Sequence, residues 1–226
     1  MALPVVVMIS RQELCFDFDA PVERRGTGSL KWDRYKGRDV IPLWVADMDF
    51  KAPPAVIEAL KERVDHGVFG YTLPPGELVN VIVEMLEREH AWKADPQWLV
   101  WLPGLVTGIN VACRSVGAPG DAVMTTTPAY PPFLGAPALS GRTLIAVPHR
   151  DDGARYVFDF EGMEQAVSGG TRLFLLCNPQ NPTGRVFTRE ELMRLAQICL
   201  RHGIVICSDE IHCGLVLDPD AHHVSI

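Results

Sequence analysis

Residues 171–209 read TRLFLLCNPQNPTGRVFTREELMRLAQICLRHGIVICSD, and this stretch decides the fold. It opens with a continuous apolar run, 171–178, of the kind found in parallel sheets that are covered on both faces. A second apolar run, 204–207, follows a segment with the apolar spacing of a helix. Strand, helix and strand in this order are typical of a parallel α/β sheet.

The helix between these two runs is marked at both ends. Thr188 is a helix N-cap, and Glu191 completes a capping box. His202 lies near the negative end of the helix dipole, and Gly203 ends the helix. The side chains expected to form its buried stripe are Leu192, Leu195, Ala196, Cys199 and Leu200.

Helices and strands alternate along most of the remaining chain, whereas residues 1–45 are irregular. The expected helices cover 53–67 and 76–90, the second with one buried face, and a third begins after Gly104; the expected strands cover 98–102, 121–127 and 142–148. This alternation predicts an α/β layer structure with right-handed crossovers.

The composition excludes several classes of protein. The chain has 226 residues, 47% of them hydrophobic, which is enough for one large domain or for part of a bigger protein. Its 28 acidic and 21 basic residues give a net charge of −7, so neither nucleic acid nor an anionic membrane is an expected partner. No stretch is long and apolar enough for a membrane helix, and the starting segment 1–10 lacks the basic region of a signal peptide.

The cysteines and histidines predict neither a disulfide framework nor a metal site. The six cysteines are scattered without CxxC spacing, at Cys15, Cys113, Cys177, Cys199, Cys207 and Cys213. Free thiols inside apolar runs are typical of a reducing compartment, so a cytoplasmic location is expected. His212 with Cys213, or His222 with His223, has no second ligand cluster nearby.

Three polar segments follow expected strands: TTPAYPPF (126–133), NPQNPTG (178–184) and SDEIH (208–212). In open α/β sheets, ligands bind at the carboxyl ends of the strands. Taken singly, each segment has an ordinary explanation: an Asn-Pro step forms a turn, Asp209 caps a helix or pairs in a salt bridge, and Tyr130 belongs to the core. Their convergence on one edge of the sheet is the main functional signal.

In this order and spacing, the segments resemble the fold-type I pyridoxal 5′-phosphate (PLP) enzymes, the class I/II aminotransferase superfamily, from about Phe16 to the end. SLKWDRY, IPLWVADMDF, GVFGYTLP and TTPAYPPF are similar to its cystathionine β-lyase branch of the MalY/PatB type. The resemblance implies an aspartate aminotransferase-like fold with three α/β/α layers and a mostly parallel sheet, incomplete at the C-terminus. Residues 1–45 would belong to a small domain, and 46–226 would form part of a large PLP-binding domain.

The resemblance also implies four residues around the cofactor ring. Asp209 matches the aspartate that pairs with the pyridine nitrogen, where a carboxylate keeps that nitrogen protonated. Asn181 matches the donor to the phenolic oxygen. Tyr130 matches the aromatic residue that stacks on the ring. His212 falls near the same phenolic oxygen, although plain packing explains it nearly as well.

Other residues would bind the phosphate and the substrate. Gly104, Leu105 and Val106 match a turn whose backbone amides meet the phosphate at a helix N-terminus. Tyr71 matches a tyrosine that reaches the phosphate of the neighbouring subunit, which implies a homodimer. Residues 44–47 resemble the segment that lies over the substrate side.

One required residue has no match in this chain. The resemblance implies a lysine that forms a Schiff base with PLP and follows the aspartate, yet the five lysines (31, 36, 51, 61 and 93) all precede Tyr130. No catalytic residue is therefore assigned. We expect the N-terminal portion of a longer enzyme that is inactive by itself; a non-catalytic truncated homologue and an unrelated α/β binding module are the alternatives.

The resemblance implies a reaction for the longer enzyme. It would be a carbon–sulfur β-lyase that acts on cystathionine or a related cysteine S-conjugate, a small amino-acid substrate, and releases a thiol, pyruvate and ammonia. An aminotransferase is the alternative, because it shares the cofactor and the abstraction of the α-proton.

Overall fold

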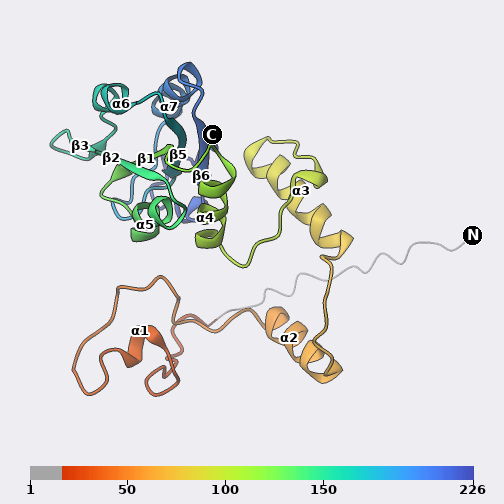
Figure 1. Ribbon diagram of the computed structural model, residues 1–226. Helices are drawn as coiled ribbons and strands as arrows, with labels where there is room; N and C mark the ends of the chain where they lie inside the picture. The colour runs from red at the N-terminus through yellow and green to blue at the C-terminus, as the bar shows by residue number, and fades with distance from the viewer. Residues whose placement is uncertain (1–16) are drawn as a thin grey trace, which may run out of the picture. The chain divides into compact units, whose positions relative to one another are not determined.

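The computed structural model describes residues 17–226, so the expectations for segment 1–10 and for Cys15 lie outside the described residues. The chain divides into two compact units (Figure 1), of which the first ends at Leu73 and the second spans Pro74–Ile226. The assignment of residues 1–45 to a small domain and 46–226 to a large one stays a prediction.

The described part of the first unit contains two helices. Helix α1 (Leu30–Asp33) begins after Ser29, whose side chain accepts a hydrogen bond from the backbone of Trp32. Helix α2 (Pro54–His66) begins with proline, which is tolerated in a first helical turn, and ends at Gly67 in the left-handed region with φ of 74°. The helix predicted over 53–67 is confirmed.

The second unit is built around a sheet of four parallel strands. The strands are β1 (Ala122–Thr127), β2 (Thr143–Pro148), β5 (Thr171–Cys177) and β6 (Val205–Asp209). Their order across the sheet is β2-β1-β5-β6, and every pairing is parallel. A short antiparallel hairpin joins β3 (Arg150–Asp151) and β4 (Tyr156–Val157). The predicted parallel α/β sheet is confirmed.

Helices cover both faces of this sheet. The helices of the unit are α3 (Gly76–His90), α4 (Leu105–Ser115), α5 (Pro131–Leu139), α6 (Phe160–Ala166) and α7 (Arg189–Arg201), with 3₁₀ turns at Pro96–Trp98 and Cys213–Leu215. Figure 1 shows α6 and α7 on one side of the sheet and α4 and α5 on the other. Each side has its own buried apolar cluster, so the unit has three α/β/α layers.

The strand–helix–strand unit of β5, α7 and β6 forms as its sequence predicts. Both hydrogen bonds of the Thr188–Glu191 capping box are present. The buried stripe differs from the prediction, because Leu200 is 79% exposed, Ala196 is only half-buried, and Ile198 is 3% exposed. Ile198 stands three residues after the fully buried Leu195, which places both on the face that packs on the sheet.

Two other expectations are wrong in the described structure. Residues 98–102 form no strand; Pro96–Trp98 is a 3₁₀ turn, and Val100 and Trp101 are exposed. A strand needs a neighbour that pairs with its backbone, and no described strand lies beside this segment. Helix α3 forms as predicted, but none of its residues is buried, so its apolar stripe packs only in part.

Within residues 17–226, no helix is long and apolar enough to cross a membrane. The same residues contain no group of three or more histidine, cysteine or acidic side chains that could hold a metal ion.

Candidate functional site

The carboxyl ends of β5 and β6 lie side by side in the sheet. The last residues of the two strands, Cys177 and Asp209, are partners in the parallel register. Just beyond them, the backbone N–H of Asn178 donates to the carbonyl of Asp209 at 2.9 Å. The loop that follows β5 is therefore held against the end of β6, as the convergence of the polar segments predicts.

Asp209 presents a partly available carboxylate at this edge. Its side chain is half-buried, and Oδ1 accepts a hydrogen bond from the backbone N–H of Ile211 at 3.1 Å. No donor among residues 17–226 bonds to Oδ2. A half-buried carboxylate with one unused oxygen suits a cationic N–H group, because opposite charges attract more strongly away from bulk water. This free acceptor oxygen therefore fits the N–H group of a protonated ring nitrogen.

Asn181 follows β5 in the loop 178–184. Its backbone N–H donates to the Sγ atom of Cys177 at 3.4 Å, and the same thiol donates to the carbonyl of Pro179 at 3.3 Å. The side-chain amide of Asn181 has no hydrogen-bond partner in the described part of the chain and is half-buried. It is free to donate to an oxygen of a bound ligand.

The base of this loop is anchored by residues that sequence reasoning missed. Asn178 is fully buried, and its Nδ2 donates to the carbonyl of Val224 at 2.9 Å. Cys177 holds the backbone of Asn181, as described above. An Asn-Pro step in a sequence predicts only a turn, so no sequence signal shows which distant carbonyl its side chain meets.

The thiols beneath the site are held in their neutral form. Burial, together with the charge of Asp209, raises the pKa of Cys177 to about 11. Burial likewise raises the pKa of Cys207, on β6, to about 11. These groups are poor nucleophiles at neutral pH, so they act as packing and hydrogen-bonding residues.

Tyr130 lies between β1 and α5, at the N-cap position of the helix. The residue is 40% exposed, and its hydroxyl bonds to no residue among 17–226. The backbone carbonyl of Tyr130 accepts from the N–H of Phe133 at 2.9 Å, which fixes the first turn of the helix. A flat, partly exposed ring at the sheet edge suits stacking against a flat heterocycle.

Gly104, Leu105 and Val106 form the N-terminal end of α4. Gly104 is the N-cap, and the side chains of Leu105 and Val106 are exposed. The first N–H groups of a helix have no partner within it and carry the positive end of its dipole. Ile109 and Cys113, further along α4, pack into the cluster on one face of the sheet, so α4 is anchored to the same layer as the other site residues.

Two of the expected residues gain no support from their surroundings. His212 is half-buried, and its imidazole bonds to no side chain or backbone group in the described ranges. Tyr71 belongs to the first unit and is fully exposed. The roles expected for both stay predictions.

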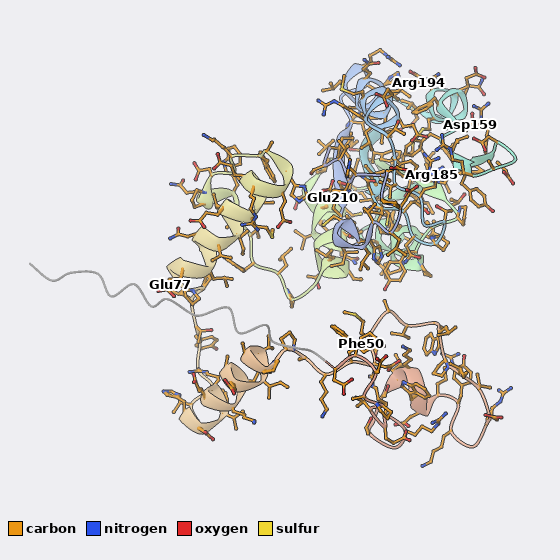
Figure 2. All side chains as sticks on the ribbon, turned by 180° about the vertical axis from the view of Figure 1, so that it is seen from behind. Phe50, Glu77, Asp159, Arg185, Arg194 and Glu210 are labelled. Atoms are coloured by element: carbon orange, nitrogen blue, oxygen red, sulfur yellow. The ribbon has the colours of Figure 1, made fainter. Side chains whose placement is uncertain are left out.

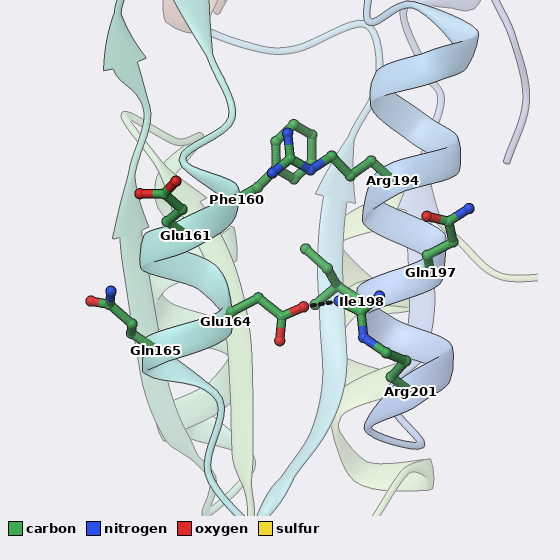
Figure 3. Close-up of a pocket in the computed structure, with 8 residues that line it drawn as sticks. All are labelled: Phe160, Glu161, Glu164, Gln165, Arg194, Gln197, Ile198 and Arg201. Atoms are coloured by element: carbon green, nitrogen blue, oxygen red, sulfur yellow. Dashed lines mark hydrogen bonds and ion pairs between the residues drawn. The ribbon is translucent and has the colours of Figure 1, made fainter.

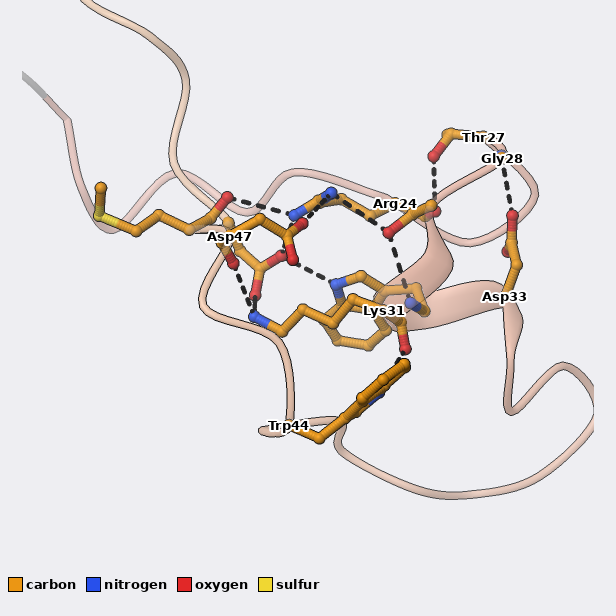
Figure 4. Close-up of polar contacts among 11 residues, drawn as sticks. Arg24, Thr27, Gly28, Lys31, Asp33, Trp44 and Asp47 are labelled. Carbon is orange, nitrogen blue, oxygen red and sulfur yellow. Dashed lines mark hydrogen bonds and ion pairs between the residues drawn. The ribbon is translucent and has the colours of Figure 1, made fainter. Parts of the chain in front are cut away.

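The segment 44–47 of the first unit is held by a network of charged groups (Figure 4). Lys31 is buried, and its Nζ donates to the carbonyl of Asp47 at 3.0 Å and to Oδ2 of Asp49 at 2.9 Å. Arg24 pairs with the carboxylates of Asp47 and Asp49 at 2.6 and 2.7 Å. Hydrogen bonds hold the pKa of Asp49 well below its usual range, and the bond from Lys31 has the largest effect. The expected place of this segment over the substrate stays a prediction.

Glu210, the residue next to Asp209, contacts two segments near the end of the described chain. Oε1 of Glu210 accepts from the hydroxyl of Ser208 at 2.8 Å, and Oε2 lies 2.9 Å from Nε2 of His223. Figure 2 labels Glu210 on the unit that carries the sheet. Through this side chain, the strand end and the segment around His223 are tied together.

A groove elsewhere in the unit lies between α6 and α7 (Figure 3). The guanidinium of Arg194 lies 4.3 Å from the centre of the Phe160 ring, and Glu164 pairs with Arg201. Glu164 also lies 2.9 Å from His202 at the end of α7. None of these residues belongs to the segments that follow β1, β5 and β6, so the groove is separate from the candidate site.

A family model and a curated protein are similar to this chain. Residues 38–225 match the family model described as aminotransferase class I and II. The chain is 42% identical over 211 residues to cystathionine beta-lyase PatB of Bacillus subtilis (strain 168), covering 91% of this chain and 54% of that protein.

Solved structures are also similar to this chain. The crystal structure of OvoB has a TM-score of 0.87 and 45% identity, covering 92% of this chain and 55% of that one. Cystalysin from Treponema denticola, whose crystal structure contains a pyridoxal 5′-phosphate cofactor, has a TM-score of 0.86 and 34% identity, covering 93% of this chain and 55% of that one. The chain spans about half the length of the relatives it matches.

Proposed function

The chain belongs to the aminotransferase class I and II family, and we propose from this premise that it is part of a PLP-dependent carbon–sulfur β-lyase. The observation that carries the proposal is the pair of ligand groups at the adjacent ends of β5 and β6, Asn181 and Asp209, in a chain 42% identical to a cystathionine β-lyase. The substrate would be cystathionine or a related cysteine S-conjugate.

The residues of this chain would bind and orient the cofactor. The unused oxygen of Asp209 would hold the proton on the ring nitrogen, and the amide of Asn181 would donate to the phenolic oxygen. Tyr130 would stack on the ring, and the N–H groups of residues 104–106 would bind the phosphate. When bound, PLP supplies an electron sink for the charge that develops at the α-carbon of the substrate.

The overall reaction would be a β-elimination. The substrate loses its α-proton, the bond between its β-carbon and sulfur breaks, and the sulfur departs as a thiol. Hydrolysis of the remaining fragment gives pyruvate and ammonia. By keeping the ring nitrogen protonated, Asp209 would lower the barrier to the first of these steps.

The test uses the complete protein, cystathionine and PLP, with pyruvate measured by reduction with lactate dehydrogenase. We expect pyruvate to form without an added keto acid. Transamination, which the family name favours as the second candidate, would instead depend strictly on a keto acid as amino-group acceptor. If intact, PLP-loaded protein forms neither pyruvate nor a transamination product, the proposal is refuted.

We also propose that the 226-residue chain is inactive by itself, because none of its five lysines follows Asp209. A preparation whose mass matches the 25.0 kDa chain should release no more pyruvate from cystathionine than free PLP does. Turnover well above that level would show that another residue does the work expected of the lysine.

The complete protein is proposed to be a homodimer in the cytoplasm. The exposed Tyr71 is available to reach a neighbouring subunit. Five cysteines in the described residues are free thiols, as is usual in a reducing compartment. Light scattering on the active protein tests the assembly, and a strictly monomeric active form would contradict it.

A further inference from the structure

One buried side chain joins the loops that carry Tyr130 and Asn181. Gln180 is 4% exposed, and its Nε2 donates to the backbone carbonyl of Pro128 at 2.7 Å. Pro128 directly follows β1 and stands two residues before Tyr130, whereas Gln180 directly precedes Asn181. The hydrogen bond therefore links two loops that follow neighbouring strands.

The other contacts of Gln180 stay inside its own loop. Its Oε1 accepts from both the backbone N–H and the hydroxyl of Thr183, at 2.9 and 2.5 Å. Its backbone N–H donates to the carbonyl of Arg185 at 2.8 Å, and its carbonyl accepts from the N–H of Gly184 at 2.8 Å. The amide oxygen thus holds the loop around Asn181, and the amide nitrogen sets the distance to the neighbouring loop.

We propose that Gln180 is a positioning residue that fixes Tyr130 relative to Asn181. The inference rests on the proposed function, in which these two side chains contact the same cofactor ring. A stacking ring and a hydrogen-bond donor act together only when their spacing matches the ligand, and small displacements in such sites are costly. Gln180 itself does not have to touch the cofactor.

The strands do not need Gln180 in order to pair. β1 and β5 are joined by their backbone ladder and by a second buried side-chain bond, from the hydroxyl of Thr125 to the carbonyl of Leu175 at 2.9 Å. Thr125 is as buried as Gln180 but lies within the strand rather than in the loops. Thr125→Val is therefore a matched control that removes one buried hydrogen bond between the same two strands.

The experiment compares Gln180→Met, Gln180→Glu and Thr125→Val in the complete protein, with no substrate present. Thermal unfolding of the apo form reports stability, and titration with PLP, followed by absorbance, reports the dissociation constant. We expect all three variants to lose stability, because each removes a buried hydrogen bond. Only the Gln180 variants should bind PLP more weakly, by about tenfold, which corresponds to the loss of one such bond.

A pH series adds a readout that a merely structural role would not produce. At neutral pH the ionised carboxylate of the Gln180→Glu variant has no proton to donate to Pro128. Once protonated, it has one O–H donor for Pro128 and one carbonyl acceptor for Thr183, the two functions that the amide of Gln180 serves here. Its PLP affinity relative to the wild-type protein should recover as the pH falls, whereas that of Gln180→Met should not.

The outcomes separate the two proposals. Unchanged PLP affinity in Gln180→Met, or an equal loss in Thr125→Val, would overturn the positioning role while leaving the proposed function intact. If Gln180→Met does not fold, the isosteric Gln180→Glu variant and its pH series decide the question. Absence of PLP binding in the wild-type protein would overturn the proposed function, and the inference with it.

Discussion

Cys177 and Asp209 face each other across the last parallel pair of β5 and β6, and the loop that carries Asn181 begins one residue beyond Cys177. This pairing brings an acceptor at the end of β6 close to the loop after β5 that carries a donor. The backbone register of the sheet, not the charge of the side chain, sets the position of Asp209. Removing that charge should therefore leave the fold intact.

Asp209→Asn in the complete protein should abolish most lyase activity while the fold is retained. The amide oxygen can still accept from Ile211, but a neutral amide does not stabilise a protonated ring nitrogen. A nearby opposite charge shifts a pKa by about one to three units, so activity should fall by about 10- to 1000-fold. Pyruvate release and circular dichroism check the prediction. Asp220→Asn, at an exposed position, is the control, and near-normal turnover in Asp209→Asn would exclude the assigned role.

Glu191→Ala should destabilise the second unit far more than Thr188→Ala. The carboxylate of Glu191 pairs with Nη2 of the buried Arg185 at 2.7 and 2.5 Å, so its removal leaves a buried cation without a carboxylate partner. We expect a loss of about 3–5 kcal/mol for Glu191→Ala. Thr188→Ala, which removes the helix cap, should lower the free energy of unfolding by about 1 kcal/mol.

Urea unfolding of the chain measures both losses. Glu89→Ala removes an exposed ion pair with Arg88 and should change the free energy of unfolding by less than about 1 kcal/mol. Equal effects of Glu191→Ala and Thr188→Ala would show that the pair with Arg185 contributes nothing beyond the cap.

His149 should make the second unit sensitive to mild acid. Its ring packs on Phe158 and Phe187 at 5.3 and 5.9 Å between centres, and burial lowers its pKa below 6.5. The unfolded chain therefore binds a proton at a pH where the folded chain does not. The stability is fully present above about pH 6.5 and falls as the pH decreases below that value.

His149→Phe should flatten this dependence between pH 7 and 5, since the replacement does not titrate. Unfolding midpoints across that range provide the measurement. If the stability falls equally between pH 7 and 5 in the variant and in the wild-type chain, His149 is not the source of the acid sensitivity.

Cys199 should weaken the fold at alkaline pH. Its thiol lies in the cluster beneath α7, and burial raises its pKa to about 11. Between about pH 9 and 11 the unfolded chain loses this proton while the folded chain keeps it, so stability decreases as the pH rises, by up to about 1.4 kcal/mol per pH unit. Cys199→Ala should show a shallower alkaline slope, and the two proteins should run parallel between pH 6 and 8. Parallel curves above pH 9 would contradict the assignment.

Much of the central fold could be predicted from local sequence. The capping box at Thr188 and the apolar runs 171–178 and 204–207 are short-range signals, and each appears in the structure at the predicted place. The failed strand at 98–102 shows the limit of such signals. An apolar run forms a strand only if another strand pairs with it, and that partner is not encoded in the run itself.

The sequence by itself determined the types of residue at the candidate site and the order in which they occur. A carboxylate after one strand and an amide after another are local facts, and the parallel α/β pattern already predicts that their loops meet at one edge. The tertiary structure alone decided which atoms remain available there. One carboxylate oxygen of Asp209 accepts from the backbone N–H of Ile211, and the Sγ atom of Cys177 accepts from the backbone N–H of Asn181. Gln180, an ordinary loop residue by its sequence, bonds to a carbonyl 52 positions away, because hydrogen bonds depend on distance in space rather than on separation along the chain.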